Sequence, residues 1–258
     1  MKNHTPSSQI KRSGFTLVET VIAMGIITIM ITAFLAAFGP AVQGIRKSMS
    51  SKEANRLAST LEYELSVLRP ADAPGVDDGR YKTAFEKAWW WIRNSAHPSV
   101  KDVHIVIYQY RGDPNVASRP DGTLMPYTGT DGVPGQDYVL QSVARRLRND
   151  SLQEELKPGV VEGRVFYVRM TQLIFKDGAL VLSDQPLKII DPTEPRQPTT
   201  LPANYPEAVI AFQAEFYALK SSLYAYVRNT FNLDDANGDG HPDATGKPVF
   251  TRNLGVRR

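Results

Sequence analysis

Residues 11–19 read Lys-Arg-Ser-Gly-Phe-Thr-Leu-Val-Glu, and an apolar run without any charge follows them as far as Phe38. Phe15 to Phe38 covers 24 residues, which is roughly 36 Å of α-helix at about 1.5 Å per residue. That length is enough to cross the hydrocarbon core of a bilayer, which is about 30 Å thick. The sequence therefore predicts a membrane-crossing helix that begins directly after a short basic leader.

Glu19 is the only ionised side chain within this apolar segment. A carboxylate at membrane depth costs on the order of 2–3 kcal/mol, so it needs either a partner or a proton. The alternative is that Glu19 lies near the membrane surface and extends its carboxylate into the headgroup region. A plain single-pass anchor or an uncleaved secretory signal gives no reason for this residue, and a secretory apolar region is usually shorter, about 7–15 residues.

Three features of the N-terminus occur together: a basic leader that ends in Gly14, an apolar residue at Phe15, and a glutamate at the fifth position after the glycine, Glu19. Residues 11–38 resemble the class III signal of type IV pilins and of the pseudopilins of type II secretion systems. The resemblance implies that a prepilin peptidase cleaves after Gly14 and methylates the new amino terminus at Phe15. It also implies that Glu19 pairs with that amine, on the same or a neighbouring subunit.

The resemblance also implies an orientation that charge alone does not give, because basic residues lie on both sides of the span. The leader, residues 1–14, is expected in the cytoplasm. The remainder is expected outside the inner membrane, in the periplasm or at the cell surface, as part of a filament.

The net charge of +3 belongs to the leader. Three of the basic side chains and none of the acidic ones lie in residues 1–14, so the remaining chain carries 27 of each sign. Bulk charge therefore predicts no nucleic-acid partner. The chain has no cysteine, which excludes disulfides, thiolate metal sites, a lipoprotein anchor and cysteine catalysis. Many pilins have a C-terminal disulfide, and this sequence departs from them there.

Residues 39–69 continue the helix in amphipathic form. After Gly39-Pro40, apolar residues recur at helical spacing (Ile45, Met49, Leu57, Leu61, Leu65 and Leu68), with charged residues on the other faces. A residue that precedes proline avoids the α-helical region, so the helix should end before Pro70. We expect one long helix from residue 15 to about 68, crossing the membrane over residues 15–38 and packing on a globular domain over residues 39–69.

Residues 70–258 are expected to form this globular head. Residues 81–96 predict a short helix that carries Trp89, Trp90 and Trp91, which point in directions about 100° apart. Either two of them enter the core and one is half-exposed, or one serves a dedicated interface. Runs rich in β-branched and aromatic residues predict about five strands: 103–110, 164–175, 179–182, 208–219 and 223–227. Residues 138–148 fit a strand or a helix.

Turns, rather than helices, connect most of these strands, so the sheet should be antiparallel. The fold class expected is therefore α+β, with the second half of the long helix packed on a mainly antiparallel sheet. Residues 112–137 and 184–206 are rich in Gly, Pro or Asp and predict long loops.

Residues 235–246 contain a pattern typical of calcium loops. Asp235, Asn237 and Asp239 alternate before Gly240, and Asp243 follows, as in the first nine positions of an EF-hand-type loop. The backbone carbonyl of His241 would complete the ligands, so we expect a calcium site formed by Asp235, Asn237, Asp239, His241 and Asp243. The twelfth position is Gly246, not the usual bidentate glutamate. The alternative is a polar turn without metal.

The chain contains none of the common nucleotide-binding, serine-hydrolase or zinc-protease motifs. Its four histidines show no metal-ligand spacing, and His104, inside an apolar run, is interpreted as a core or edge residue. The expectation is a pilin-like structural subunit, not an enzyme: a minor pilin or pseudopilin that contacts prepilin peptidase and other pilin subunits. The segment after Phe38 also resembles prepilin-type cassette proteins. The alternative function is a membrane-tethered head that binds a ligand or adheres to a surface.

Overall fold

The computed structural model describes residues 16–69, 81–185, 187–193, 197–230 and 247–258, and it has the expected α+β fold. Its helices are α1 (Leu17–Ser66), α2 (Ala84–Asn94) and α3 (Leu152–Glu155), with short helical turns at Lys101–Val103, Pro202–Asn204 and Tyr226–Thr230. Its strands are β1 (Ile105–Asp113), β2 (Met125–Pro126), β3 (Val139–Arg146), β4 (Val161–Lys176), β5 (Ala179–Leu182), β6 (Ile189–Ile190), β7 (Pro198–Thr199), β8 (Val209–Ala218) and β9 (Phe250–Arg257).

The contacts divide the chain into two units, residues 1–48 and residues 49–258, so α1 begins in one and ends in the other. In the first unit α1 continues through Pro40. The Thr28 and Thr32 hydroxyls each donate a hydrogen bond of 2.8 Å to the carbonyl four residues earlier. These bonds satisfy the hydroxyls inside the helix, so threonine costs little in this apolar segment.

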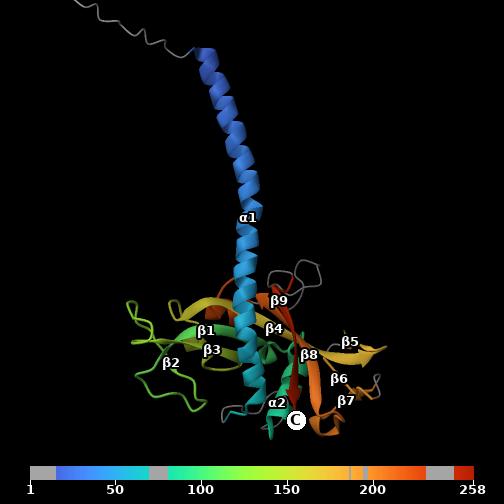
Figure 1. Ribbon diagram of the computed structural model, residues 1–258. Coiled ribbons are helices and arrows are strands. Elements are labelled where there is room, and N and C mark those ends of the chain that lie inside the picture. The colour runs from blue at the N-terminus through green and yellow to red at the C-terminus, as the bar shows by residue number, and fades with distance from the viewer. Residues whose placement is uncertain (1–15, 70–80, 186, 194–196, 231–246) are drawn as a thin grey trace, which may run out of the picture. The chain divides into compact units, whose positions relative to one another are not determined.

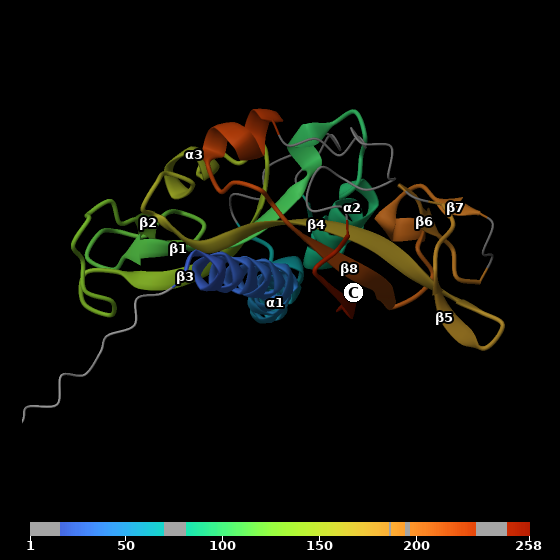
Figure 2. The same ribbon diagram turned by 90° about the horizontal axis from the view of Figure 1, so that it is seen from above.

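The second unit is built on a sheet of seven strands among the described residues, in the order β2-β1-β4-β8-β9 with β3 on β1 and β5 on β4. Every pair within this sheet is antiparallel, as expected. β4 is the longest strand and pairs in turn with β1, β8 and β5. Figure 2 shows it running through the sheet, with the β4–β5 hairpin extending at one end.

The second half of α1 packs on one face of this sheet. Ala54, Leu57, Ala58, Leu61 and Leu65 have no exposed surface, and they form one core cluster with side chains of α2, β1, β4, β8 and β9. Their spacing of three and four residues is the helical stripe seen in the sequence. A second cluster covers the opposite face of the sheet, where residues of α3 and of the turn after β8 contribute.

Helix α2 carries the three tryptophans. Thr83 caps it by accepting a hydrogen bond of 3.1 Å from the backbone N–H of Glu86. Trp89 and Trp91 are buried in the core, and Trp90 is partly buried against it. The interpretation with two tryptophans in the core and one half-exposed is therefore confirmed, and these residues form no large exposed aromatic surface.

The sheet differs from expectation at residues 223–227, at β9 and at β2, a short strand inside the loop expected over residues 112–137. The strand predicted at residues 223–227 is wrong: Tyr226–Thr230 is a short helical turn, and Val227 is buried against the sheet. β9 was not predicted, yet it pairs with β8 over eight residues, from Val209↔Arg257 to Phe216↔Phe250, and lies beside it in Figure 1. Residues 139–146, which fitted either structure, form a strand because each of them pairs with β1.

Candidate functional site

The processing site predicted at Gly14 and Phe15 lies outside the described residues. The description begins at Thr16, whose hydroxyl accepts a hydrogen bond of 3.3 Å from the backbone N–H of Glu19. Thr16 thus caps the first turn of α1, and the spacing Thr-x-x-Glu is that of a capping box. This role of Thr16 was missed in the sequence, although the spacing signals it.

Glu19 lies in that first turn, and its side chain is exposed. A carboxylate in the first turn interacts favourably with the positive end of the helix dipole. The partner that the resemblance implies, the amine of Phe15, lies outside the described residues. The structure therefore places Glu19 at the start of the helix without testing its pairing.

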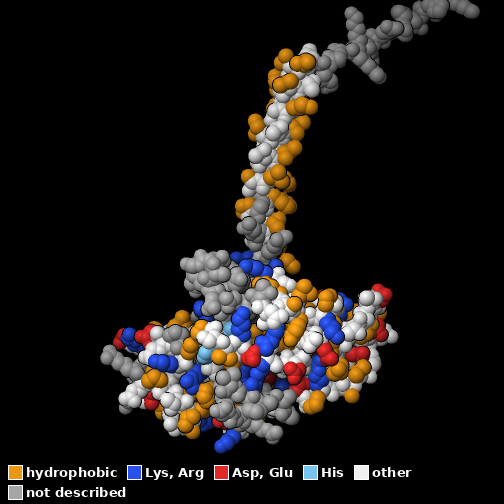
Figure 3. Space-filling model, turned by 180° about the vertical axis from the view of Figure 1, so that it is seen from behind, with side chains coloured by type: hydrophobic (Ala, Val, Ile, Leu, Met, Phe, Trp, Pro, Cys, Tyr) orange, Lys and Arg blue, Asp and Glu red, His pale blue; other side chains and the backbone are white. Residues whose placement is uncertain are grey.

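The helix surface that follows Glu19 is apolar and bare within the first unit. Large apolar side chains on every side of it are more than half exposed, among them Met24, Ile29 and Phe34. Figure 3 shows apolar side chains along the visible face of this part of α1. Among the described residues, α1 is the one helix long and apolar enough to cross a membrane. A helix that is apolar all round is stable only when lipid or other protein covers it.

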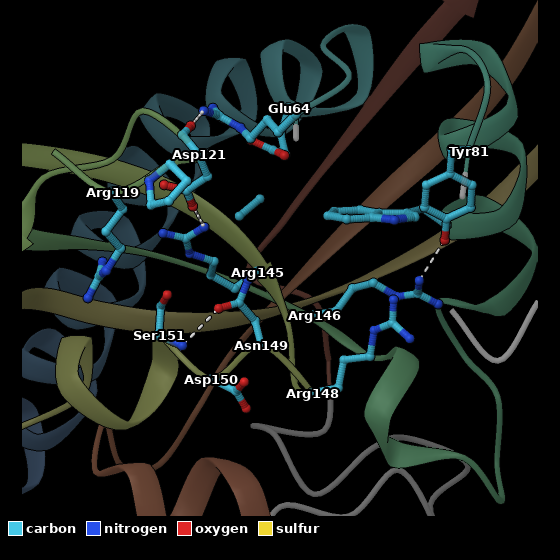
Figure 4. A pocket seen from close by; sticks show the side chains of 14 residues that line it. Glu64, Tyr81, Arg119, Asp121, Arg145, Arg146, Arg148, Asn149, Asp150 and Ser151 are labelled. Atoms are coloured by element: carbon cyan, nitrogen blue, oxygen red, sulfur yellow. Dashed lines mark hydrogen bonds and ion pairs between the residues drawn. The ribbon is translucent and has the colours of Figure 1, made fainter. Parts of the chain in front are cut away.

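The head contains a second concentration of polar side chains, which sequence reasoning missed. Arg145, on β3, donates hydrogen bonds to Asp121 (2.5 Å), to the Thr123 hydroxyl (2.9 Å) and to Glu155 (2.8 Å). The Tyr108 hydroxyl also donates to Glu155. Glu155 and Tyr108 are fully buried and Arg145 nearly so. Figure 4 shows Arg145 directed at Asp121.

The pKa values of this cluster follow from burial and charge pairing. Burial would raise the pKa of Asp121, but hydrogen bonds from Thr123 and Arg145 outweigh it and lower that pKa to about 2. Burial and the nearby charge of Glu155 raise the pKa of Tyr108. Arg145, whose pKa is raised by its acidic neighbours, and Asp121 therefore stay charged at neutral pH and form a matched ion pair rather than a proton-transfer pair.

A hollow of about 330 Å³ lies beside the cluster, between the end of α1, α2 and β3. Its wall includes Arg119 and Arg145, which pair with Glu155. It also includes Arg146, which donates a hydrogen bond of 2.6 Å to the Tyr81 hydroxyl oxygen (Figure 4). None of the residues that line it is a histidine, and its one serine, Ser151, is hydrogen-bonded through its backbone to Asn149. The arrangement anchors loops to the sheet and shows no nucleophile next to a base.

His104 is a core residue, in line with the sequence-based interpretation. It is buried, and its Nε2 lies 2.8 Å from the carbonyl oxygen of His97. Burial lowers the pKa of His104 to about 4. The neutral ring can donate to that carbonyl, which is a structural role.

The predicted calcium ligands, Asp235, Asn237, Asp239, His241 and Asp243, all lie outside the described residues. Within the part of the chain that the structure describes, no group of three or more histidine and carboxylate side chains could hold a metal ion.

A model of the prokaryotic N-terminal methylation motif matches residues 10–35 of the chain. No curated protein and no solved structure matches the chain significantly. The motif is the one that prepilin peptidases process, and the apolar helix that follows it indicates a single-pass membrane anchor. The motif and the long N-terminal helix together fit a type IV pilin-like or pseudopilin-like protein.

Proposed function

We propose that this protein is a structural subunit of a filament of the type IV pilus or type II secretion type, and specifically a minor pilin or minor pseudopilin. The observation that carries the proposal is the methylation motif at residues 10–35, followed by a helix whose apolar side chains are exposed on all sides. In the proposal, prepilin peptidase removes residues 1–14. The bare helix lies first in the inner membrane and then among the helices of other subunits, with the head outside.

The head supports a role in contact rather than in chemistry. Its buried ionic groups are paired within the chain, and the hollow beside them presents no catalytic arrangement. Long loops connect β1 to β3 and β5 to β8, and they carry the two-residue strands β2, β6 and β7. Such loops on a rigid sheet provide variable surfaces for neighbours, which favours a specialised subunit over the bulk one.

Two substitutions test the proposal in cells that assemble the filament. Gly14→Ala should block processing, because the peptidase requires the glycine at its cleavage site. Glu19→Gln should leave processing intact and impair incorporation, because the amide removes the charge that would pair with the Phe15 amine. Immunoblots of membranes measure processing, and blots of sheared filaments measure incorporation.

Glu19→Gln also separates pairing from helix capping, because glutamine satisfies a capping box as well as glutamate does. Incorporation of Glu19→Gln at the wild-type level would contradict the pairing role. A Gly14→Ala protein that runs at the processed size would contradict the whole proposal.

We also propose that residues 235–246 bind calcium through Asp235, Asn237, Asp239, the His241 carbonyl and Asp243. Support comes from the sequence spacing alone. The segment leads directly toward β9, an edge strand of the sheet, so a bound ion would fix the chain before that strand. Asp235→Ala with Asp239→Ala should lower the Tm of the full chain only when calcium is present. Asp131→Ala, at an exposed position between β2 and β3, is the control. An equal loss of Tm in chelator would indicate a plain turn.

A further inference from the structure

A second hollow in the head, of about 230 Å³, lies between α2, β4 and the segment that precedes β6. Each of these elements contributes one basic side chain to its wall, namely Arg93, Arg169 and Lys188. Among the described residues, no aspartate or glutamate lines it, and the acidic residues near Lys188 in sequence, Asp184 and Asp191, are not part of the wall. The hollow therefore concentrates positive charge.

The chain itself neutralises only part of this charge. The Nε of Arg169 donates a hydrogen bond of 2.5 Å to the carboxylate of Glu215, so this pair is matched. Among the described residues, Arg93 and Lys188 form no ion pair with a carboxylate. The Nζ of Lys188 lies 3.4 Å from the amide oxygen of Gln185, a neutral acceptor. Two positive charges of the wall thus remain without an acidic partner.

Arg93 is held in place by its other contacts. Its Nε donates a hydrogen bond of 3.3 Å to the carbonyl of Leu187. Its guanidinium carbon lies 5.3 Å from the ring centroid of Trp89 and 5.1 Å from that of Trp90. These contacts use one nitrogen and the face of the guanidinium, and its two terminal nitrogens donate to no group in the described part of the chain. Those nitrogens belong to the fork that binds oxyanions in a bidentate manner.

The segment that carries Lys188 is strained next to the hollow. Leu187 has φ of 65°, a conformation that is a genuine outlier for a bulky residue. Such strain persists only where the surrounding structure enforces it, and it is concentrated at ligand-binding and active sites. The strained residue provides the carbonyl that fixes Arg93, and Gln185 and Lys188 on either side of it both line the hollow.

Acceptor groups around the hollow are already used within the chain. The Ser95 hydroxyl donates to the carbonyl of Met170 at 3.0 Å, and the side-chain amide of Gln172 donates to the carbonyl of Ile190 at 2.8 Å. The amide oxygen of Gln185 faces Lys188, which leaves its NH₂ group as a donor. What the hollow still offers is therefore a set of donors, so a group that completes it must be an acceptor.

We infer that this hollow binds a phosphate-type dianion, held by Arg93 and Lys188 with the Gln185 amide as a further donor. A phosphate monoester carries about −1.5 to −2 charges at pH 7 and three strong acceptor oxygens, which matches two unpaired cations better than a single carboxylate does. The volume of about 230 Å³ is below the roughly 300–1,000 Å³ of pockets that enclose a drug-sized ligand. The hollow therefore holds the free ion or the phosphate end of a small molecule. This inference does not rest on the filament role.

Calorimetric titration of the full chain in non-ionic detergent, at constant ionic strength, tests the inference. The probes are inorganic phosphate and glycerol 3-phosphate, with acetate as the singly charged comparison. The protein should bind one equivalent of phosphate or of its ester, and acetate should bind at least tenfold more weakly. Tighter binding of the ester would assign the site to a phosphate ester such as a lipid headgroup, and tighter binding of the ion to free phosphate. Binding of neither probe would overturn the inference.

Three substitutions that each remove one positive charge locate the binding. Lys188→Gln and Arg93→Gln should each raise the Kd for the probe by at least tenfold. Lys157→Gln, at an exposed position two residues after α3 that lines neither hollow, is the matched control and should leave the Kd unchanged. Lys188 is exposed, so its variant should keep the wild-type Tm and tests binding without a change in folding.

Tryptophan fluorescence gives a second readout, because Arg93 contacts two indole rings. The probe should change the fluorescence of the wild type and of Lys157→Gln, and it should leave that of Arg93→Gln unchanged. An equal rise in Kd for Lys157→Gln and Lys188→Gln would mean that only net charge matters, and it would overturn the inference.

Discussion

The two halves of α1 are both rich in apolar residues, yet these residues are exposed in the first half and partly buried in the second. In residues 17–48 the large apolar side chains are exposed, as at Ile29, which is 70% exposed. In residues 49–66 the apolar side chains form a stripe, and Leu57, Leu61 and Leu65 have no exposed surface. The difference lies in pattern rather than in hydrophobicity. A stripe is covered by the chain's own sheet, whereas an all-round apolar surface requires lipid or other subunits.

The largest expected effect is a loss of head stability from a substitution in the covered half of α1. Leu61→Ala should lower the free energy of unfolding of the head by about 2–5 kcal/mol, because it leaves a cavity in the core. Ile27→Ala, in the bare half, is the control and should leave head unfolding unchanged. Thermal unfolding of the full chain in detergent, followed by near-UV circular dichroism of the tryptophans, measures both. Equal losses would mean that the bare half is also part of the folded core.

The second expected effect is a pH dependence of folding stability, which arises from a buried residue of the head. Burial lowers the pKa of His104 to about 4 from 6.5, so the unfolded chain binds this proton more readily than the folded head does. Stability from the neutral ring is therefore fully present above pH 6.5 and is lost as pH falls toward 4, by up to about 3 kcal/mol. His104→Gln keeps a donor for His97 and should show a shallower loss across this range. An unchanged pH profile in denaturant titrations would rule out His104 as the source.

The smallest expected effect comes from a substitution that tests the contact between the covered half of α1 and the sheet. Gly163 has φ of +80°, and a Cβ there would lie 2.0 Å from the Glu53 carboxylate, which accepts a hydrogen bond of 2.8 Å from the N–H of Arg164. Gly163→Ala should cost about 1–3 kcal/mol, because it combines backbone strain with loss of that contact. Gly178→Ala, at φ +84° in open space, should cost only the strain, about 1 kcal/mol.

Thermal unfolding of the full chain in detergent measures the loss of stability for both substitutions. If Gly163→Ala and Gly178→Ala lost the same stability, the Glu53 contact would contribute nothing to holding the helix on the sheet.

Local pattern was enough to predict α1, the buried stripe and the β4–β5 hairpin, because each depends on neighbours in sequence. β9 was missed because only Leu254 and Val256 of its residues are buried, which leaves too weak an alternation to read. Residues 223–227 were assigned to a strand for their aromatic and β-branched content. Packing of Val227 against the sheet overrides that preference.

The candidate sites also divide into one that neighbouring residues reveal and one that only the folded structure brings together. The N-terminal motif is contiguous, so sequence reasoning found it, and the family match at residues 10–35 supports it. The Arg145 cluster was not found, because Tyr108, Asp121 and Glu155 meet only when β1, a loop and α3 come together. No spacing in the sequence signals a cluster of that kind.

We propose that the bare half of α1, residues 17–48, is a processed prepilin-type helix. The most direct test is the intact mass and N-terminal sequence of the protein purified from its native membrane. A processed helix would give a chain that begins at an N-methylated Phe15. A chain that begins at Met1, or near Pro40 without the helix, would contradict it.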